Sequence, residues 1–170
     1  MDQKLGLRGR HWALAAALWA GAAGVWALEP GMPAPGFELA GLSQPVRLDQ
    51  YKGKVVYLDF WASWCGPCRQ SFPWMNAVQK KWAAQGLVVL GVNLDAKAAD
   101  AAQFLQAHPA EFTVAFDPKG QTPALYQVKG MPTSVLIGRN GKVLFQHAGF
   151  RPSDTAALEA RMAAALQGQP

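Results

Sequence analysis

The chain has 170 residues, of which 51% are hydrophobic, and a formal net charge of +5. Residues 1–27 hold three of the basic residues and one acid, so the remainder of the chain carries +3 and is long enough to form one domain with a buried core. The basic residues of this remainder are scattered rather than gathered in a stripe. This distribution argues against a nucleic-acid-binding protein.

The N-terminal segment 1–27 has the pattern of a secretory signal peptide. Lys4, Arg8 and Arg10 precede an uncharged apolar run over 12–27, and a small-residue site predicts cleavage after Ala27. An uncleaved membrane anchor is the alternative, although the run of about 16 residues is shorter than the roughly 20 of a spanning helix. With a cleaved signal peptide or with an uncleaved anchor, the rest of the chain would be exported. We expect a proline- and glycine-rich linker over 28–36 and one domain over 37–170.

The rest of the chain alternates between strand and helix patterns. Two runs, VVYLDFW at 55–61 and LVVLGVNLD at 87–95, are nearly continuous β-formers and predict strands covered on both faces. The other expected elements are two short strands within 37–48, helices over 66–85, 98–108 and 121–128, strands over 112–116, 133–138 and 142–149, and a last helix from Ser153, its N-cap, to Leu166. Gly86 should end the first helix, and Asn140-Gly141 should form a tight hairpin turn. This order predicts an α/β protein with a mixed sheet and helices on both of its faces.

Both cysteines of the chain lie in WCGPC, where a strand is followed directly by a helix. The unpaired N–H groups and the positive dipole of a helix start favour a thiolate, and such motifs lower the cysteine pKa by about 1.5 units. A spacing of three positions also places Cys65 and Cys68 within disulfide distance. Pro67 costs no hydrogen bond in the first turn, and Gly66 allows another backbone to approach Cys65. We expect Cys65 to attack a substrate and Cys68 to resolve the mixed disulfide.

Three other uses of the cysteine pair fit the sequence less well. A static disulfide across so short a ring would stabilise the fold little. A zinc site needs about four ligands, whereas His108 and His147 are far apart in the chain and His11 belongs to the targeting segment. A cysteine protease would need a Cys–His pair and no second cysteine. Redox exchange therefore fits the motif best.

The motif and its surroundings resemble the thioredoxin superfamily. WCGPC after VVYLDFWAS, with GMPTS farther along the chain at 130–134, is similar in particular to the exported TlpA/ResA/CcmG-like thiol–disulfide oxidoreductases. The segment LDQYKGKVV, the FP pair after the motif and the helix–strand segment at 98–116 match that branch. The resemblance implies a thioredoxin fold with an N-terminal β-hairpin extension and a central helix–strand insertion.

The resemblance also implies a second part of the site. In such proteins the proline of the GMPTS segment, here Pro132, is cis and lies against the active-site disulfide. Met131 would then present its backbone to a bound substrate segment, with Thr133 beside it. Trp64, next to the first cysteine, would line the docking surface together with Gly66 and Pro67.

Asp59 lies in the middle of an apolar strand, where poor solvation should raise its pKa. In similar thioredoxins an aspartate at this place accepts and donates the proton of the deeper cysteine. One position departs from the TlpA/ResA pattern, because Ser71 stands where that branch often carries a glutamate. This difference favours a generic exchange partner over a specialised reductase of cytochrome apoproteins.

We therefore expect a periplasmic reductase that reduces substrate proteins bearing disulfides or oxidised thiols and needs no cofactor other than its redox-active disulfide. The alternatives are a disulfide-donating oxidase or isomerase and a metal-handling module without enzymatic activity. The resemblance implies a membrane thiol electron donor of the DsbD/CcdA kind. A monomer, soluble in the bacterial periplasm or tethered to the inner membrane, is the expected form.

Overall fold

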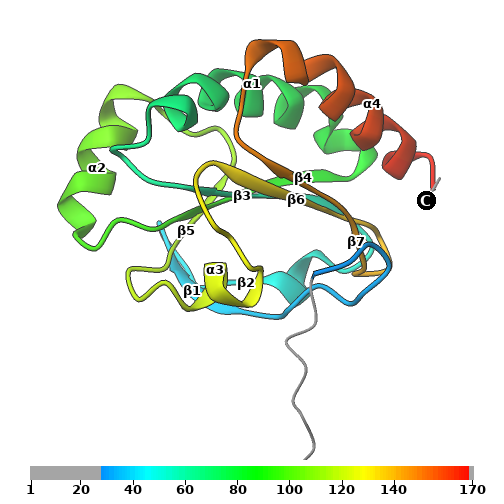
Figure 1. The fold of residues 1–170 in the computed structure, drawn as a ribbon, viewed down its shortest axis with the longest axis horizontal. Helices are drawn as coiled ribbons and strands as arrows, with labels where there is room; N and C mark the ends of the chain where they lie inside the picture. Colours follow the sequence, from blue (N-terminus) through cyan, green and yellow to red (C-terminus); the bar gives the residue numbers. More distant parts are fainter. Residues whose placement is uncertain (1–27, 169–170) are drawn as a thin grey trace, which may run out of the picture.

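The computed structural model describes residues 28–168, so the predicted targeting segment lies outside the described residues. A seven-stranded mixed sheet with the order β2-β1-β5-β4-β3-β6-β7 forms the centre of the molecule (Figure 1). The strands are β1 Glu38–Gly41, β2 Val46–Arg47, β3 Val55–Trp61, β4 Leu87–Asn93, β5 Thr113–Phe116, β6 Thr133–Ile137 and β7 Val143–Ala148. The helices are α1 Gly66–Trp82, α2 Ala98–Ala107, α3 Gln121–Leu125 and α4 Thr155–Leu166, with 3-10 turns η1 Leu48–Tyr51, η2 Ala83–Gln85 and η3 Pro152–Asp154.

The sheet is mixed, as the sequence predicts. Strands β3, β4 and β5 run parallel, whereas β6 pairs antiparallel with β3 and with β7. The predicted hairpin of β1 and β2 joins the sheet through β1, which pairs antiparallel with β5. The hairpin extension and the helix–strand insertion, far apart in sequence, are therefore neighbours at one edge of the sheet.

Helices cover the two faces of the sheet unequally. In Figure 1, α1, α2 and α4 lie on one face, while α3 lies on the other. Strand β3 serves both layers, because Tyr57 and Trp61 belong to the core under α1, while Leu58 and Phe60 belong to the opposite core. Every residue of β3 is buried, which explains its continuous apolar pattern.

Both ends of the sheet are held by specific contacts. At the end of β3 that leads into α1, the antiparallel β6 begins, so the WCGPC motif and the GMPTS segment meet there. At the opposite end, the guanidinium of Arg139 donates hydrogen bonds to the carbonyl oxygens of Gly53 and Gln85 at 2.8 Å and of Leu166 at 3.3 Å. One side chain thus joins the approach to β3 to the C-terminal ends of two helical segments.

Residues 28–36 follow the body of the domain. The N–H of Gly31 donates to the carbonyl of Val143 at 2.7 Å, and the N–H of Ala34 donates to that of Gly141 at 2.9 Å. No helix within residues 28–168 is long and apolar enough to cross a membrane.

Local details differ from the sequence prediction at three places. Ser153 is not the N-cap of the last helix, because Pro152 opens a 3-10 turn there, closed by a hydrogen bond from the N–H of Arg151 to the Asp154 carboxylate. The helix predicted over 121–128 ends at Leu125. In the β6–β7 turn only Gly141 has a positive φ, so the turn takes a longer form rather than the tight form with two central residues of positive φ.

Candidate active site

The two cysteines lie where β3 passes into α1. Cys65 is the N-cap residue of α1 and is joined by a disulfide to Cys68, with 5.3 Å between the Cα atoms. The N–H of Cys68 donates to Sγ of Cys65 at 3.2 Å. In the reduced protein the same N–H, with the helix dipole, would stabilise a thiolate at Cys65.

The surroundings of the two sulfurs differ. Cys65 is 4% exposed and Cys68 is completely buried, whereas Gly66 and Pro67 between them are exposed. A Cβ atom placed on Gly66 would meet no other atom within 4 Å, so the approach to this turn is open. Of the two cysteines, Cys65 is therefore the more accessible from solvent.

A buried carboxylate holds the loop before Cys65. Asp95, 5% exposed, accepts hydrogen bonds from the backbone N–H of Ser63 at 3.0 Å and from its hydroxyl at 3.0 Å. The side-chain amide of Asn93 donates to the same carboxylate at 2.8 Å. Our sequence interpretation missed this anchor, although two polar residues at the end of a buried strand, Asn93 and Asp95, were the available signal.

The GMPTS segment meets the motif at the same end of the sheet. The Met131–Pro132 peptide bond is cis, as the resemblance implies. Pro132 is buried, and Met131 is partly buried and packs against the core cluster that contains both cysteines. Thr133 is 2% exposed and its hydroxyl donates to the Gly130 carbonyl at 2.7 Å, so its side chain supports the loop from within.

Asp59 is 2% exposed, on the face of β3 that α1 covers. Burial raises the pKa of Asp59 to about 8, and a hydrogen bond with the Ser134 hydroxyl partly opposes this rise. Its Oδ1 atom has no hydrogen-bond partner in the described part of the chain. The carboxyl is therefore placed to exchange a proton near neutral pH.

Ser71, which stands where the TlpA/ResA resemblance implies a glutamate, does not leave an exposed polar group. It is 1% exposed, and its hydroxyl donates to the Cys68 carbonyl at 2.9 Å. The hydroxyl thus bonds to a backbone carbonyl three residues earlier in α1, and the side chain adds no charge beside the disulfide.

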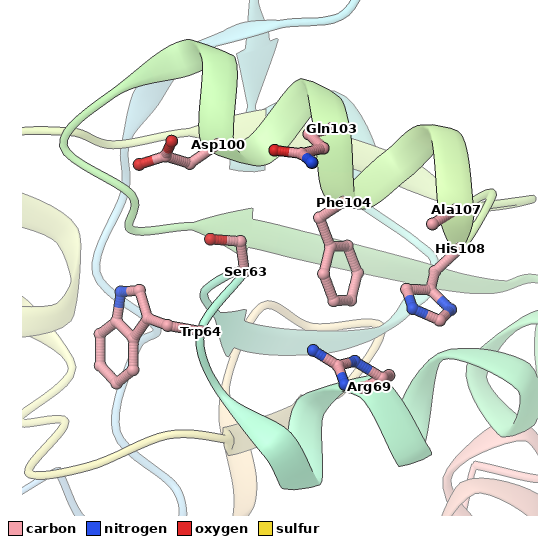
Figure 2. A pocket seen from close by; sticks show the side chains of 8 residues that line it. All are labelled: Ser63, Trp64, Arg69, Asp100, Gln103, Phe104, Ala107 and His108. Carbon is pink, nitrogen blue, oxygen red and sulfur yellow. The ribbon is translucent and has the colours of Figure 1, made fainter.

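A polar groove of about 310 Å³ lies between α1 and α2, next to the motif. Figure 2 shows Phe104 of α2 and His108, the residue that follows α2, pointing toward Arg69 on α1, with Ser63 and Trp64 at the other end. Trp64 is 72% exposed. The helix–strand insertion thus contributes one wall of the surface beside Cys65.

Neither His108 nor His147 joins the cysteine pair. His108 contacts the Phe104 ring, and Nε2 of His147 lies 3.5 Å from Asp154 without forming a hydrogen bond. Within residues 28–168, no three side chains of the types His, Cys, Asp and Glu gather where they could hold a metal ion.

Comparison with known proteins agrees with this geometry. Residues 30–146 match the AhpC/TSA family. The chain belongs to the AhpC/TSA family. Among curated relatives of this AhpC/TSA protein, a thiol-disulfide oxidoreductase ResA of Bacillus thuringiensis is 33% identical over 123 residues, 72% of this chain and 71% of the relative. A second ResA, of Geobacillus thermodenitrificans, is 36% identical over 69% of this chain and 68% of its own length.

A solved structure is similar over nearly all of its length. The crystal structure of a Chlorobium tepidum protein, provisionally described as a thiol:disulfide interchange protein DsbE, is 66% identical, with a TM-score of 0.82, and the match covers 82% of this chain and 99% of that one. These similarities and the bonded cysteine pair make this AhpC/TSA protein a thiol–disulfide oxidoreductase with a thioredoxin-like fold. The expected TlpA/ResA/CcmG-like resemblance is confirmed.

Proposed function

We propose that this oxidoreductase is an exported reductase of protein disulfides and oxidised thiols. The observation that carries the proposal is the Cys65–Cys68 pair at the start of α1, in which the N–H of Cys68 donates to Sγ of Cys65, together with the buried acid Asp59 on the face of β3 that α1 covers. The Gly-Pro sequence between the cysteines resembles the reducing thioredoxins and favours this direction over oxidation. The signal-like pattern of residues 1–27 supports a periplasmic location, soluble or membrane-tethered.

The reaction begins at Cys65. Its thiolate attacks one sulfur of the substrate disulfide, forms a mixed disulfide and releases the other substrate sulfur, which takes a proton from water. The thiol of Cys68 then gives its proton to the Asp59 carboxylate, and its sulfur attacks Cys65. The bond between Cys65 and the substrate breaks, and the second substrate sulfur leaves as a thiolate and is protonated.

Two electrons have then passed from the protein to the substrate, and the Cys65–Cys68 disulfide has formed. A membrane thiol donor would restore the dithiol by the reverse exchange, with no further cofactor. Substrate would dock along Trp64, Gly66, Pro67 and the backbone of Met131. Thr133 would keep that backbone in place. The protein would act as a monomer.

The reduction potential separates a reductase from an oxidase. Equilibration with redox buffers should give a value near that of thioredoxin, about −270 mV, rather than the roughly −120 mV of a strong oxidant. A value close to the latter would reverse the proposed direction. Titration of the reduced protein with copper and zinc tests the metal-handling alternative, for which stoichiometric binding would be required.

Trapping identifies the substrates. The Cys68→Ser variant should accumulate mixed disulfides through Cys65 in the periplasm, and the Cys65→Ser variant is the matched control. Equal capture by the two variants would contradict the assigned roles of the cysteines.

A further inference from the structure

Besides the Ser134 hydroxyl, the phenol of Tyr57 lies near the buried carboxyl of Asp59. The phenol of Tyr57 donates to Oγ of Ser134 at 2.6 Å, and each of these residues is 2% exposed. Tyr57 and Asp59 are alternate residues of β3 and therefore lie on one face, and Ser134 of β6 is the cross-strand partner of Asp59. Three polar side chains thus meet under α1, joined by the pairing of two strands that are far apart in the chain.

The direction of the hydrogen bonds follows from the number of protons. A serine hydroxyl has one proton to donate and two lone pairs to accept with. Because Oγ of Ser134 accepts from Tyr57, its own proton is free, and the cross-strand pairing places it beside the Asp59 carboxylate, whose pKa the Ser134 hydroxyl lowers. Burial raises the pKa of Tyr57 far above its ordinary value, so the phenol keeps its proton and remains a donor.

We propose that Ser134, oriented by Tyr57, is a positioning residue for the proton transfer between Cys68 and Asp59. It supplies the hydrogen bond that stabilises the Asp59 carboxylate, whose other oxygen has no partner among the described residues. The inference rests on the proposed function for the role of Asp59 as proton acceptor. It adds that Ser134 of β6, a residue outside the WCGPC motif, sets the pH range over which this proton is transferred.

Other titratable groups lie on the same side of the sheet, and their titration has to be distinguished from that of Asp59. On β7, His147 is the cross-strand partner of Ser134, with Asp154 at 3.5 Å from its Nε2. On α4, Glu159 is held by the Trp74 indole and by Lys81, at 2.8 Å. At the start of α1, the nearby groups are Cys65, its N-cap residue, and Cys68. A His147→Gln variant removes the only imidazole among these neighbours and serves as a control.

Two measurements on the full chain test the proposal. The carboxyl carbon of Asp59 can be titrated by NMR in the oxidised protein, and the release of a small-molecule thiol from a mixed disulfide at Cys65 can be timed against pH. We expect Ser134→Ala to shift both midpoints upward by about one pH unit, since a hydrogen bond to a charged group is lost, and to slow release about tenfold at pH 7.

Two further variants refine the test. Ser134→Thr keeps the hydroxyl and should restore the wild-type profile. Tyr57→Phe should shift the midpoints in the same direction by a smaller amount, because the Ser134 hydroxyl remains but loses its fixed orientation. This second variant removes one oxygen atom and keeps the test available if Ser134→Ala does not fold.

Three results would overturn the proposal. The Asp59 carboxyl could titrate at the same pH in Ser134→Ala as in the wild type, the midpoints could follow His147→Gln instead, or Ser134→Ala could slow release equally in an Asp59→Asn background. The NMR titration uses the oxidised protein and does not depend on the direction of exchange. A failed reductase assay with a shifted Asp59 titration would therefore count against the proposed function only.

Discussion

Asp59 places a carboxyl group within a strand whose residues are all buried. The sequence predicts a raised pKa at this residue because VVYLDFW offers no solvated face, and the structure confirms the rise, to about 8. The identity of the hydrogen-bond partner could not be predicted. Ser134 reaches Asp59 only through the β3–β6 pairing, and no local pattern links residues so far apart in the chain.

The raised pKa of Asp59 makes stability depend on pH. The folded protein holds this proton up to about pH 8, whereas the unfolded chain releases it near pH 3.8, so the stabilisation is complete below pH 3.8 and is lost as the pH rises through 8. Between pH 5 and 7 the free energy of unfolding should fall with a contribution approaching about 1.4 kcal/mol per pH unit. Asp59→Asn should lose this slope in urea unfolding of the oxidised protein. Parallel curves for the two proteins would contradict the assignment, and His147, present in both, cancels from the comparison.

Trp64 exposes a large apolar side chain next to the attacking cysteine. Its replacement by alanine should change the free energy of unfolding by no more than about 0.5 kcal/mol, as for other surface positions. We expect the same variant to reduce insulin several-fold more slowly, because the docking surface loses its aromatic contact. Leu125, 53% exposed, is the matched control, and Leu125→Ala should leave both quantities unchanged. Equal loss of activity in the two variants would remove Trp64 from the docking surface.

At the scale of elements, the loop between β3 and α1 depends on the end of β4. Asp95 accepts from the Ser63 backbone, the Ser63 hydroxyl and the Asn93 amide, which fixes the loop that leads into Cys65. The sequence predicts both strands and the helix. This connection was missed because it joins residues that are 32 positions apart.

Loss of the Asp95 carboxylate should loosen the loop. Asp95→Ala leaves up to three donors without an acceptor, and we expect a loss of about 2–4 kcal/mol in the free energy of unfolding. The rate at which reduced Cys65 is alkylated should change as well, because Cys65, the N-cap residue of α1, is no longer held in place. Glu111→Ala, at an exposed acid, is the control and should behave like the wild type in both assays. A stable Asp95→Ala protein with a normal alkylation rate would show that the loop is held by other contacts.

The molecule as a whole separates its redox site from the contacts that close the opposite end of the sheet. The overall fold could be predicted from the alternation of strands and helices and from the resemblance. The cap of the last helix could not, since Ser153 and Asp154 are both suitable and the Pro152 turn decides between them. The three carbonyl partners of Arg139 also depend on chain ends that meet only in the folded molecule.

Arg139 should therefore affect stability without affecting exchange. Arg139→Ala removes hydrogen bonds to three carbonyl oxygens, and we expect a loss of about 2–3 kcal/mol in chemical unfolding. The reduction potential should remain unchanged, because the cysteines lie at the other end of β3. A shift in potential as large as that of a variant within the WCGPC motif would show that the two ends are coupled.

The hairpin of β1 and β2 has a consequence for the behaviour of the protein in a crowded compartment. It covers the outer edge of β5, and the strand that then faces outward, β2, has only two residues. An outermost strand of this length offers few free backbone groups for intermolecular sheet growth, so this border is protected against aggregation. The chain can thus carry an extra strand in its sheet without creating a template on which other polypeptides assemble.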